Sequence, residues 1–156
     1  QFADGGMCPD SDWHEFGEFC YRPFDVKKTW YDARSECRKL GADLVSIMSI
    51  TEQSWLESYL YLATSDVWIG LNDLEFSGYF LWSNNHEVTF TYWAPGEPNN
   101  HLGFNEDCVE MYQGNGSSYW NDIFCDAHQD WVCMIAKGKT PTEPPVPPSA
   151  IPGNTY

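Results

Sequence analysis

The spacing of apolar residues predicts a helix over about Thr29–Leu40. Its apolar positions recur at the three-to-four-residue interval of one helical face: Trp30, Ala33, Cys37 and Leu40. Thr29 and Asp32 have the spacing of a capping box, in which a side chain at the helix start accepts a hydrogen bond from the backbone of the first turn. Gly41 follows, where a helix commonly ends. We interpret the apolar stripe as a face packed on the core.

The same pattern predicts a second helix over about Ile50–Leu62. Ser49 and Glu52 again have capping-box spacing at its start. The stripe consists of large apolar side chains: Trp55, Leu56, Tyr59 and Leu60. Such a stripe is more often core than ligand-binding surface, so we do not expect either helix to carry the chemistry.

Short apolar runs of strand length surround these helices. They are Phe19–Phe24, Asp43–Val45, Val67–Leu71, Tyr79–Trp82, Cys108–Tyr112 and Trp131–Ile135. The stretch Ser83–Asn105 differs, because it is polar, rich in asparagine and interrupted by proline. A long loop in a compact domain is usually functional or disordered, and flanking strands favour an ordered one. The pattern therefore predicts an α+β fold with two helices, antiparallel strands and a functional loop.

The chain length of 156 residues fits one domain. Residues 1–7 show no pattern and are interpreted as an N-terminal linker, and residues 8–136 form the globular domain. Residues 137–156 contain six prolines and no large aromatic before Tyr156, which favours an extended, semi-rigid spacer. A spacer after a disulfide-rich domain suggests one module of a longer string, and a plain flexible C terminus fits the composition equally well.

The charge balance limits the partners. There are 23 acidic against 8 basic residues, a formal net charge of −15. A chain this acidic repels polyphosphate and anionic lipid, so we expect no nucleic-acid partner. No run approaches the roughly 18 apolar residues of a spanning helix, so we expect no membrane insertion by this chain. Cations, or surfaces bridged by cations, are the favoured partners.

Six widely spaced cysteines predict three disulfides and a location outside the cytosol. They are Cys8, Cys20, Cys37, Cys108, Cys125 and Cys133. No C-x-x-C pair is present, which disfavours a zinc site, and the spacing alone leaves all 15 connectivities open. Asn115-Gly116-Ser117 is an N-glycosylation acceptor, which fits a secreted context.

Oxygen-donor side chains gather in the long loop and just beyond it. They form three groups: Glu97, Asn99 and Asn100; Glu106 and Asp107; Asn121 and Asp122. Carboxylates and carboxamides in this number suit Ca²⁺, which takes six to eight oxygens, better than Mg²⁺, which keeps its waters. Any one of these residues could instead be ordinary solvated surface. That explanation fits the whole set less well.

Four motifs together resemble the C-type lectin domain in its long form. They are Trp68-Ile69-Gly70-Leu71, Glu97-Pro98-Asn99, Glu106-Asp107-Cys108 and Trp120-Asn121-Asp122. The resemblance covers about residues 8–136 and implies the C-type lectin-like fold, with two helices flanking antiparallel sheets below a long calcium-stabilised loop. It implies three disulfide pairs: Cys8–Cys20, Cys37–Cys133 and Cys108–Cys125. The trailing spacer further resembles linkers between the tandem modules of mannose-receptor-type endocytic receptors.

The resemblance also implies a set of ligands. The principal Ca²⁺, and through it the carbohydrate, would be held by Glu97, Asn99, Glu106, Asn121 and Asp122. In the family the peptide bond corresponding to Glu97–Pro98 is cis. A weaker auxiliary Ca²⁺ site would use Asp73, Asn100 and Asp107, together with Glu106. It is weaker because Ser77 stands where the family's pattern places an acid.

The order Glu-Pro-Asn, rather than Gln-Pro-Asp, resembles family members that bind mannose, fucose and N-acetylglucosamine. The implied partners are therefore glycans and glycoproteins with these terminal sugars, and tandem sister modules of the same kind. The implied location is extracellular, as part of the ectodomain of a cell-surface endocytic receptor or otherwise in a secreted protein. Protons compete with Ca²⁺ for carboxylates, so we expect acidification to release metal and sugar together.

Two rival functions come from different classes. Glu97 and Glu106 could act as the acid and base of a glycosidase, but interleaved asparagines favour a metal site, and no hydrolase motif is present. We therefore expect no enzymatic activity. Alternatively, the scaffold could be a protein-binding module that recognises its partner without calcium.

Overall fold

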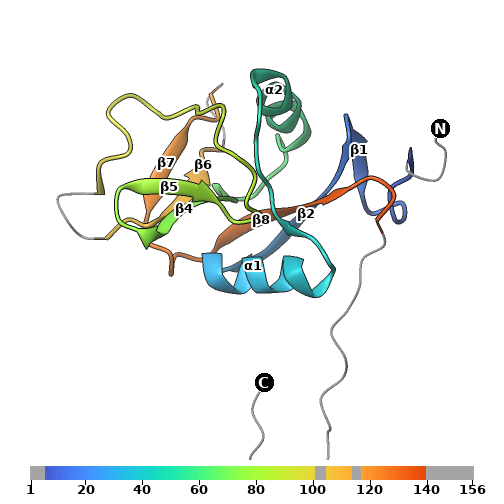
Figure 1. Ribbon diagram of the computed structural model, residues 1–156, viewed down its shortest axis with the longest axis horizontal. Coiled ribbons are helices and arrows are strands. Elements are labelled where there is room, and N and C mark those ends of the chain that lie inside the picture. Colours follow the sequence, from blue (N-terminus) through green and yellow to red (C-terminus); the bar gives the residue numbers. More distant parts are fainter. Residues whose placement is uncertain (1–5, 101–104, 114–116, 140–156) are drawn as a thin grey trace, which may run out of the picture.

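A computed structural model describes residues 6–100, 105–113 and 117–139, and it confirms the α+β class. The elements are β1 (His14–Phe16), β2 (Phe19–Lys28), α1 (Trp30–Lys39), β3 (Asp43–Leu44), α2 (Ile50–Tyr59), β4 (Val67–Phe76), β5 (Tyr79–Trp82), β6 (Cys108–Met111), β7 (Trp120–Ile123) and β8 (Gln129–Ala136). The strands form one sheet in the order β1-β2-β8-β4-β6-β7, with β3 paired to β8 and β5 paired to β4 (Figure 1). All pairs are antiparallel except β4 with β8, whose parallel pairing the apolar pattern did not predict.

Both predicted helices begin at their predicted caps. The Thr29 hydroxyl accepts from the Asp32 N–H at 3.1 Å, and the Ser49 hydroxyl accepts from the Glu52 N–H at 3.2 Å. Helix α1 has the predicted extent, but α2 ends at Tyr59 rather than near Leu62. The reason is tertiary, because the Thr64 N–H must reach the Asp130 carboxylate on β8, at 2.7 Å, and the chain turns to do so.

The strands differ from the sequence prediction in extent and number. Strands β2 and β4 are longer than the apolar runs that predicted them, since their ends pair with neighbours while facing solvent. Strands β1 and β7 were not predicted. Strand β1 has three residues and is held by pairing with β2, and β7 carries Asn121 and Asp122 at positions where an apolar pattern would be needed to recognise it.

The core lies in two layers, one on each face of the sheet. Alternate residues of a strand point to opposite faces, so Trp68 packs with α1 while Val67 and Ile69 pack toward α2. Figure 1 shows α1 on one side of the sheet and α2, with the long loop, on the other. Four tryptophans of the sheet are buried: Trp68, Trp82, Trp120 and Trp131.

Gly70, in the Trp68-Ile69-Gly70-Leu71 motif, permits a close approach of two chain segments. Its N–H donates to the Val45 carbonyl at 2.8 Å. A Cβ at this position would lie 3.0 Å from the Leu44 oxygen and 3.1 Å from the Val45 oxygen. Any larger residue would therefore push the segment after β3 away from β4.

Three disulfides join the elements, and they are the pairs that the family resemblance implies. Cys8–Cys20 ties the N-terminal segment to β2, and Cys37–Cys133 ties α1 to β8. Cys108–Cys125 joins β6 to the turn after β7. Disulfides of this density belong to oxidising surroundings, which supports an extracellular or secreted setting.

The two ends of the described chain lie side by side. The Lys137 N–H donates to the Glu18 carbonyl at 3.0 Å, and the Gly138 N–H donates to the Met7 carbonyl at 2.9 Å. Most of the two predicted linkers, residues 1–5 and 140–156, lies outside the described residues. Within the described ranges, no helix has the length and apolar character needed to cross a membrane.

Candidate metal centre

The first half of the long loop is anchored on β7. Backbone bonds of 2.8 Å join Ala94 N–H to the Trp120 carbonyl and Trp120 N–H to the Tyr92 carbonyl. The Trp93 ring packs edge-on against Phe80 and Trp120, with centroids 5.1 and 6.1 Å away. Trp93 is thus a packing anchor, and it fixes where the chain enters the Glu97-Pro98-Asn99 turn.

Asp122 is the residue on which the loop converges. Its two carboxylate oxygens accept from successive backbone N–H groups, Asn99 at 3.1 Å and Asn100 at 2.7 Å. The side-chain oxygen of Asn100 accepts in turn from the Glu106 N–H at 2.7 Å. Asp122 is only 1% exposed. Asn99, Asn100 and Glu106 therefore lie together beside the buried carboxylate of Asp122, which is 22 residues beyond Asn100 in the sequence.

Glu97 lies beside this carboxylate, and its Glu97–Pro98 bond is cis. One of its oxygens accepts from the Asn99 amide at 3.3 Å, and the second, Oε1, is buried without a hydrogen-bond donor. Burial, followed by the neighbouring Asp122 and Glu106 carboxylates, raises the pKa of Glu97 to about 7. Carboxylates crowded in this way repel one another unless a cation lies between them.

Asn121, another predicted ligand, bonds to a residue outside the predicted set. Its amide donates to the Glu110 carboxylate at 2.8 Å, across the β6–β7 pair in which these two residues are register partners. Glu110 is 3% exposed, and it was not among the predicted site residues. An acidic residue between Val109 and Met111, inside an apolar strand run, is the signal that could have found it.

The three predicted auxiliary residues do not all bond to one another: Asp73 and Asp107 are joined, and Asn100 has other partners. Asp73 N–H donates to the Asp107 carbonyl at 3.0 Å, and its Oδ2 accepts from the Gly78 N–H at 2.7 Å. The Oδ1 of Asp73 is buried without a donor. Burial, with a further contribution from Asp107, raises the pKa of Asp73 to about 6. Asn100, the third predicted auxiliary residue, bonds instead to Asp122 and Glu106.

The chemistry of this donor set fits Ca²⁺. All the predicted donors are hard oxygens, and two buried carboxylate oxygens, on Glu97 and Asp73, have no donor to satisfy them. Among the described residues, no three histidine, cysteine or acidic side chains are grouped closely enough to hold an ion by themselves. A cation here would therefore also need the amide oxygens of Asn99 and Asn121 and a backbone carbonyl.

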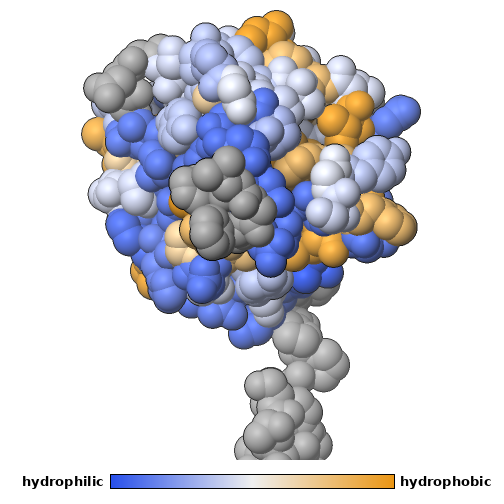
Figure 2. All heavy atoms as spheres, turned by 90° about the vertical axis from the view of Figure 1, so that its left-hand side faces the viewer, coloured by the Kyte–Doolittle hydropathy of each residue, from blue (hydrophilic) through white to orange (hydrophobic). Residues whose placement is uncertain are grey.

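Figure 2 shows the face of the molecule that lies on the left in Figure 1, on the side of β7 and the long loop. Hydrophilic residues make up most of the lower part of this face, and hydrophobic residues gather mainly toward its upper and right edges. A surface of this kind suits a hydrated ion or a ligand rich in hydroxyl groups better than an apolar ligand.

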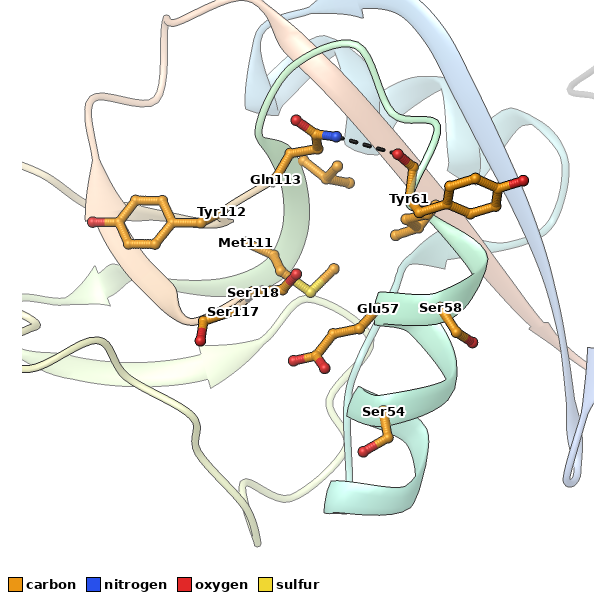
Figure 3. A pocket seen from close by; sticks show the side chains of 11 residues that line it. Ser54, Glu57, Ser58, Tyr61, Met111, Tyr112, Gln113, Ser117 and Ser118 are labelled. Atoms are coloured by element: carbon orange, nitrogen blue, oxygen red, sulfur yellow. Dashed lines mark hydrogen bonds between the residues drawn. The ribbon is translucent and has the colours of Figure 1, made fainter. Parts of the chain in front are cut away.

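A separate cavity of about 390 Å³ lies between α2 and the chain that follows β6 (Figure 3). Glu57 and Met111 point into it, and the Gln113 amide donates to the Tyr61 carbonyl at its edge, at 3.3 Å. None of its lining residues belongs to the oxygen cluster. Asn115, the predicted glycosylation site, lies outside the described residues.

The chain belongs to the C-type lectin domain family. The family described as "Lectin C-type domain" matches residues 26–135. The mouse low affinity immunoglobulin epsilon Fc receptor is 44% identical over 128 residues, which are 81% of this chain and 37% of that protein. Rat C-type mannose receptor 2 is 37% identical over 127 residues, which are 81% of this chain and 8% of that protein. The chain thus spans well under half the length of these two relatives.

Solved structures share the fold. The cow carbohydrate-recognition domain of CD23, determined in the presence of a GlcNAc2Man3 oligosaccharide, has a TM-score of 0.75 and 38% identity over 84% of this chain and 97% of that one. A calcium-independent type II antifreeze protein has a TM-score of 0.75 and 27% identity over 84% of this chain and 95% of that one. The family consists typically of non-enzymatic binding modules, generally for carbohydrate, and it includes members that do not use calcium.

Proposed function

We propose that this domain binds Ca²⁺ in its long loop and binds carbohydrate through that ion. The observation that carries the proposal is the convergence of Glu97, Asn99 and Asp122, with a buried Glu97 oxygen that no hydrogen-bond donor satisfies. The principal site would consist of the five residues that the family resemblance implies: Glu97, Asn99, Glu106, Asn121 and Asp122. Asp73, Asn100 and Asp107 would form a weaker auxiliary site, since Ser77 adds no carboxylate there.

The sugar chemistry follows from the donors and acceptors of the side chains. A bound Ca²⁺ supplies open coordination positions for two vicinal sugar hydroxyls. Glu97 and Glu106 can each accept a hydrogen bond from one hydroxyl, while Asn99 and Asn121 can each donate an N–H to the oxygen of a hydroxyl. The Asn99 amide donates to the Glu97 carboxylate at 3.3 Å, so the two groups are close enough to contact the same hydroxyl. The order Glu-Pro-Asn favours the mannose, fucose and N-acetylglucosamine class.

We expect a single site to bind one sugar weakly, with a dissociation constant of about 1 mM, or roughly −4 kcal/mol, because the ligand is small and water competes with it. Useful affinity would then come from several sites that bind a branched glycan at once. We therefore propose a tandem array of sister modules, joined by Pro-rich linkers such as residues 137–156. We propose that the domain belongs to the ectodomain of a cell-surface endocytic receptor, with a secreted protein as the alternative. The likeness to a protein named C-type mannose receptor 2 supports a receptor.

A glycan array tests this function. We expect binding to terminal mannose, fucose and N-acetylglucosamine in millimolar Ca²⁺, and its loss when EDTA removes the ion. The double variant Glu97→Gln/Asn99→Asp tests the sugar class with little change in side-chain volume, and we expect its preference to move toward galactose. Absence of any calcium-dependent binding by a correctly folded domain would overturn the proposal.

A second candidate function is recognition of a protein partner without calcium. Two relatives favour it, namely a receptor named for the immunoglobulin epsilon Fc region and an antifreeze protein described as calcium-independent. Binding to a protein that persists in EDTA and survives removal of its glycans would support this alternative. Loss of binding after either treatment would support the lectin function.

A further inference from the structure

Gln53 is a completely buried polar side chain of α2, and its amide bonds to the strand on which the long loop is anchored. The Oε1 accepts from the Trp120 indole N–H at 2.9 Å. The Nε2 donates to the Ser118 carbonyl at 2.9 Å and to the Glu57 carboxylate at 3.0 Å. A buried amide destabilises the fold unless its hydrogen bonds are made, so these bonds show what the amide does there.

A carboxamide fits this set of partners. The indole N–H needs an acceptor, whereas the carbonyl and the carboxylate need donors, and a carboxamide carries one acceptor oxygen and two N–H donors. Rotation of the amide by 180° would set its oxygen against two other oxygens, so the network fixes its orientation. An ionised glutamate would lack the donors, and a methionine of similar length would lack both the donors and the oxygen. Gln53 therefore joins α2 to β7 by bonds that neither of these side chains could make in full.

The indole of Trp120 is also the surface on which the long loop packs, on the same side of the sheet as α2 (Figure 1). The rings of Phe90 and Trp93 meet it edge-on, with centroids 5.8 and 6.1 Å away. The backbone of Trp120 bonds to Tyr92 and Ala94 at 2.8 Å each. These loop residues lead directly into the cis Glu-Pro turn, so the position of the indole sets where the chain enters that turn.

The chain that leaves the turn is held by the same face of β7. Alternate residues of a strand face the same side, so Trp120 and Asp122 share one face. The Asp122 carboxylate accepts from the Asn99 N–H at 3.1 Å and from the Asn100 N–H at 2.7 Å. The turn that carries Glu97 is therefore fixed on both sides by one strand, and a shift of Trp120 against the loop would disturb it.

We propose that Gln53 is a positioning residue, which holds the Trp120 indole so that the long loop presents its oxygen donors to Ca²⁺. The proposal rests on the proposed function, because it assigns Gln53 a role in the same site. The bonds of Gln53 lead to the metal site through Trp120, so it acts on the ligands indirectly. Substitutions that touch no ligand typically change the binding at a coupled site by about 2- to 30-fold.

A purely stabilising role must be separated from positioning, because Gln53 could serve only to keep α2 on the sheet. Tyr21 offers a matched comparison. It is buried on β2, and its hydroxyl donates to the Glu52 carboxylate on α2 at 2.9 Å. Tyr21→Phe thus removes one side-chain bond between α2 and the sheet and leaves the bonds between Trp120 and the loop in place.

Calorimetric Ca²⁺ titration of the full chain tests the proposal. Gln53→Met keeps the side-chain length and removes all three hydrogen bonds. We expect it to weaken Ca²⁺ binding by the folded protein about 5-fold or more, and Tyr21→Phe to change it by less than about twofold. Denaturant unfolding shows that each variant is folded under the titration conditions. Unchanged affinity in Gln53→Met, or an equal loss in Tyr21→Phe, would overturn the positioning role.

Trp120→Phe removes the donor of the same bond from its other side, and it tests the bond even if Gln53→Met does not fold. We expect Trp120→Phe to weaken Ca²⁺ binding as well. If Gln53 acts through this bond, the double variant Gln53→Met/Trp120→Phe should lose less affinity than the product of the two single losses. Losses that multiply would show independent action and would overturn the proposal.

Failure of the positioning role is distinguishable from failure of the proposed function. If the unmodified chain binds Ca²⁺ and Gln53→Met binds it equally well, only the positioning role is wrong. If the unmodified chain binds no Ca²⁺, both fail.

Discussion

Asp122 shows how one short side chain can organise a loop. Its two oxygens accept from consecutive backbone N–H groups, at Asn99 and Asn100, and thereby fix the chain directly after the cis Glu97–Pro98 bond. A carboxylate can accept both bonds at once because it has no proton of its own to point at the loop. The same residue is a predicted Ca²⁺ ligand, so loop order and metal binding share one group.

We therefore expect Asp122→Asn to impair both properties. The amide offers one acceptor oxygen, and its NH₂ group would face a backbone N–H of the loop. Leaving a buried donor without a partner costs about 1–3 kcal/mol of folding free energy, and we expect Ca²⁺ affinity to fall at least about 10-fold. Denaturant unfolding and calorimetric titration measure the two effects. Asp126→Asn, at an exposed acid after β7, is the control and should change neither.

At the residue scale, the sequence identified the oxygen donors but not all of their partners. Carboxylates and amides grouped in a polar loop are visible to simple inspection, because their chemistry is local. The bond from Asn121 to Glu110 was not visible, since it depends on the register in which β6 and β7 pair. The only local sign of Glu110 is that an acidic residue interrupts an apolar run.

At the scale of elements, the buried carboxylate of Asp130 fixes the turn between the end of α2 and the start of β4. Asp130 on β8 accepts from the Thr64 N–H at 2.7 Å and from the Lys27 ammonium group at 3.1 Å, and its own N–H donates to the Ser65 hydroxyl at 2.9 Å. These bonds tie β2, β8 and the turn after α2 together. The helix start was predictable from a cap within its first turn, whereas its end depends on this long-range contact.

We expect Asp130→Asn to destabilise the protein at neutral pH by about 1–3 kcal/mol, because an amide N–H would replace one of the buried acceptor oxygens that serve the Thr64 N–H and the Lys27 ammonium group. Burial acts to raise the pKa of Asp130, but the bonds from Thr64 and Lys27 outweigh it and the net shift is downward. A lowered pKa adds stability above the ordinary aspartate range and loses it as the pH falls through the folded-state pKa.

Urea unfolding of both proteins at several pH values measures this effect. The stability difference between wild type and Asp130→Asn should be largest near pH 7 and should shrink on acidification below about pH 4. A difference that is the same at neutral pH and at about pH 3 would show that the ionised carboxylate contributes nothing to the stability of this turn.

At the scale of the whole molecule, the sheet brings together segments that are distant in the chain. The loop of residues 97–100 comes to lie beside Glu106 and Asp122 because it is bonded to β7, and β7 is paired to β6. The Cys108–Cys125 disulfide also joins β6 to the turn after β7. In a chain of net charge −15, this arrangement concentrates carboxylates where a divalent cation would relieve their repulsion.

Proton competition at this cluster predicts release of ligand in acid. Glu97, Glu106 and Asp122 must be ionised to hold Ca²⁺, so protonation weakens metal binding and the sugar leaves with the metal. We expect sugar binding in about 1 mM Ca²⁺ to be strong near pH 7.4 and to fall at least about 10-fold near pH 5. Binding to immobilised mannose measures this dependence. Equal affinity at both values would exclude acid release, and raising the Ca²⁺ concentration in acid should restore binding if competition is the cause.

The sequence by itself determined the two helices and their caps and the oxygen donors of the loop, because each of these depends on residues a few positions apart or on side-chain chemistry alone. The resemblance to C-type lectin domains added the disulfide pairs. The tertiary structure alone decided the end of α2, the existence of β7, the parallel pairing of β4 with β8, and the bond between Asn121 and Glu110. These features depend on contacts between distant segments, and such contacts exist only once the chain has folded.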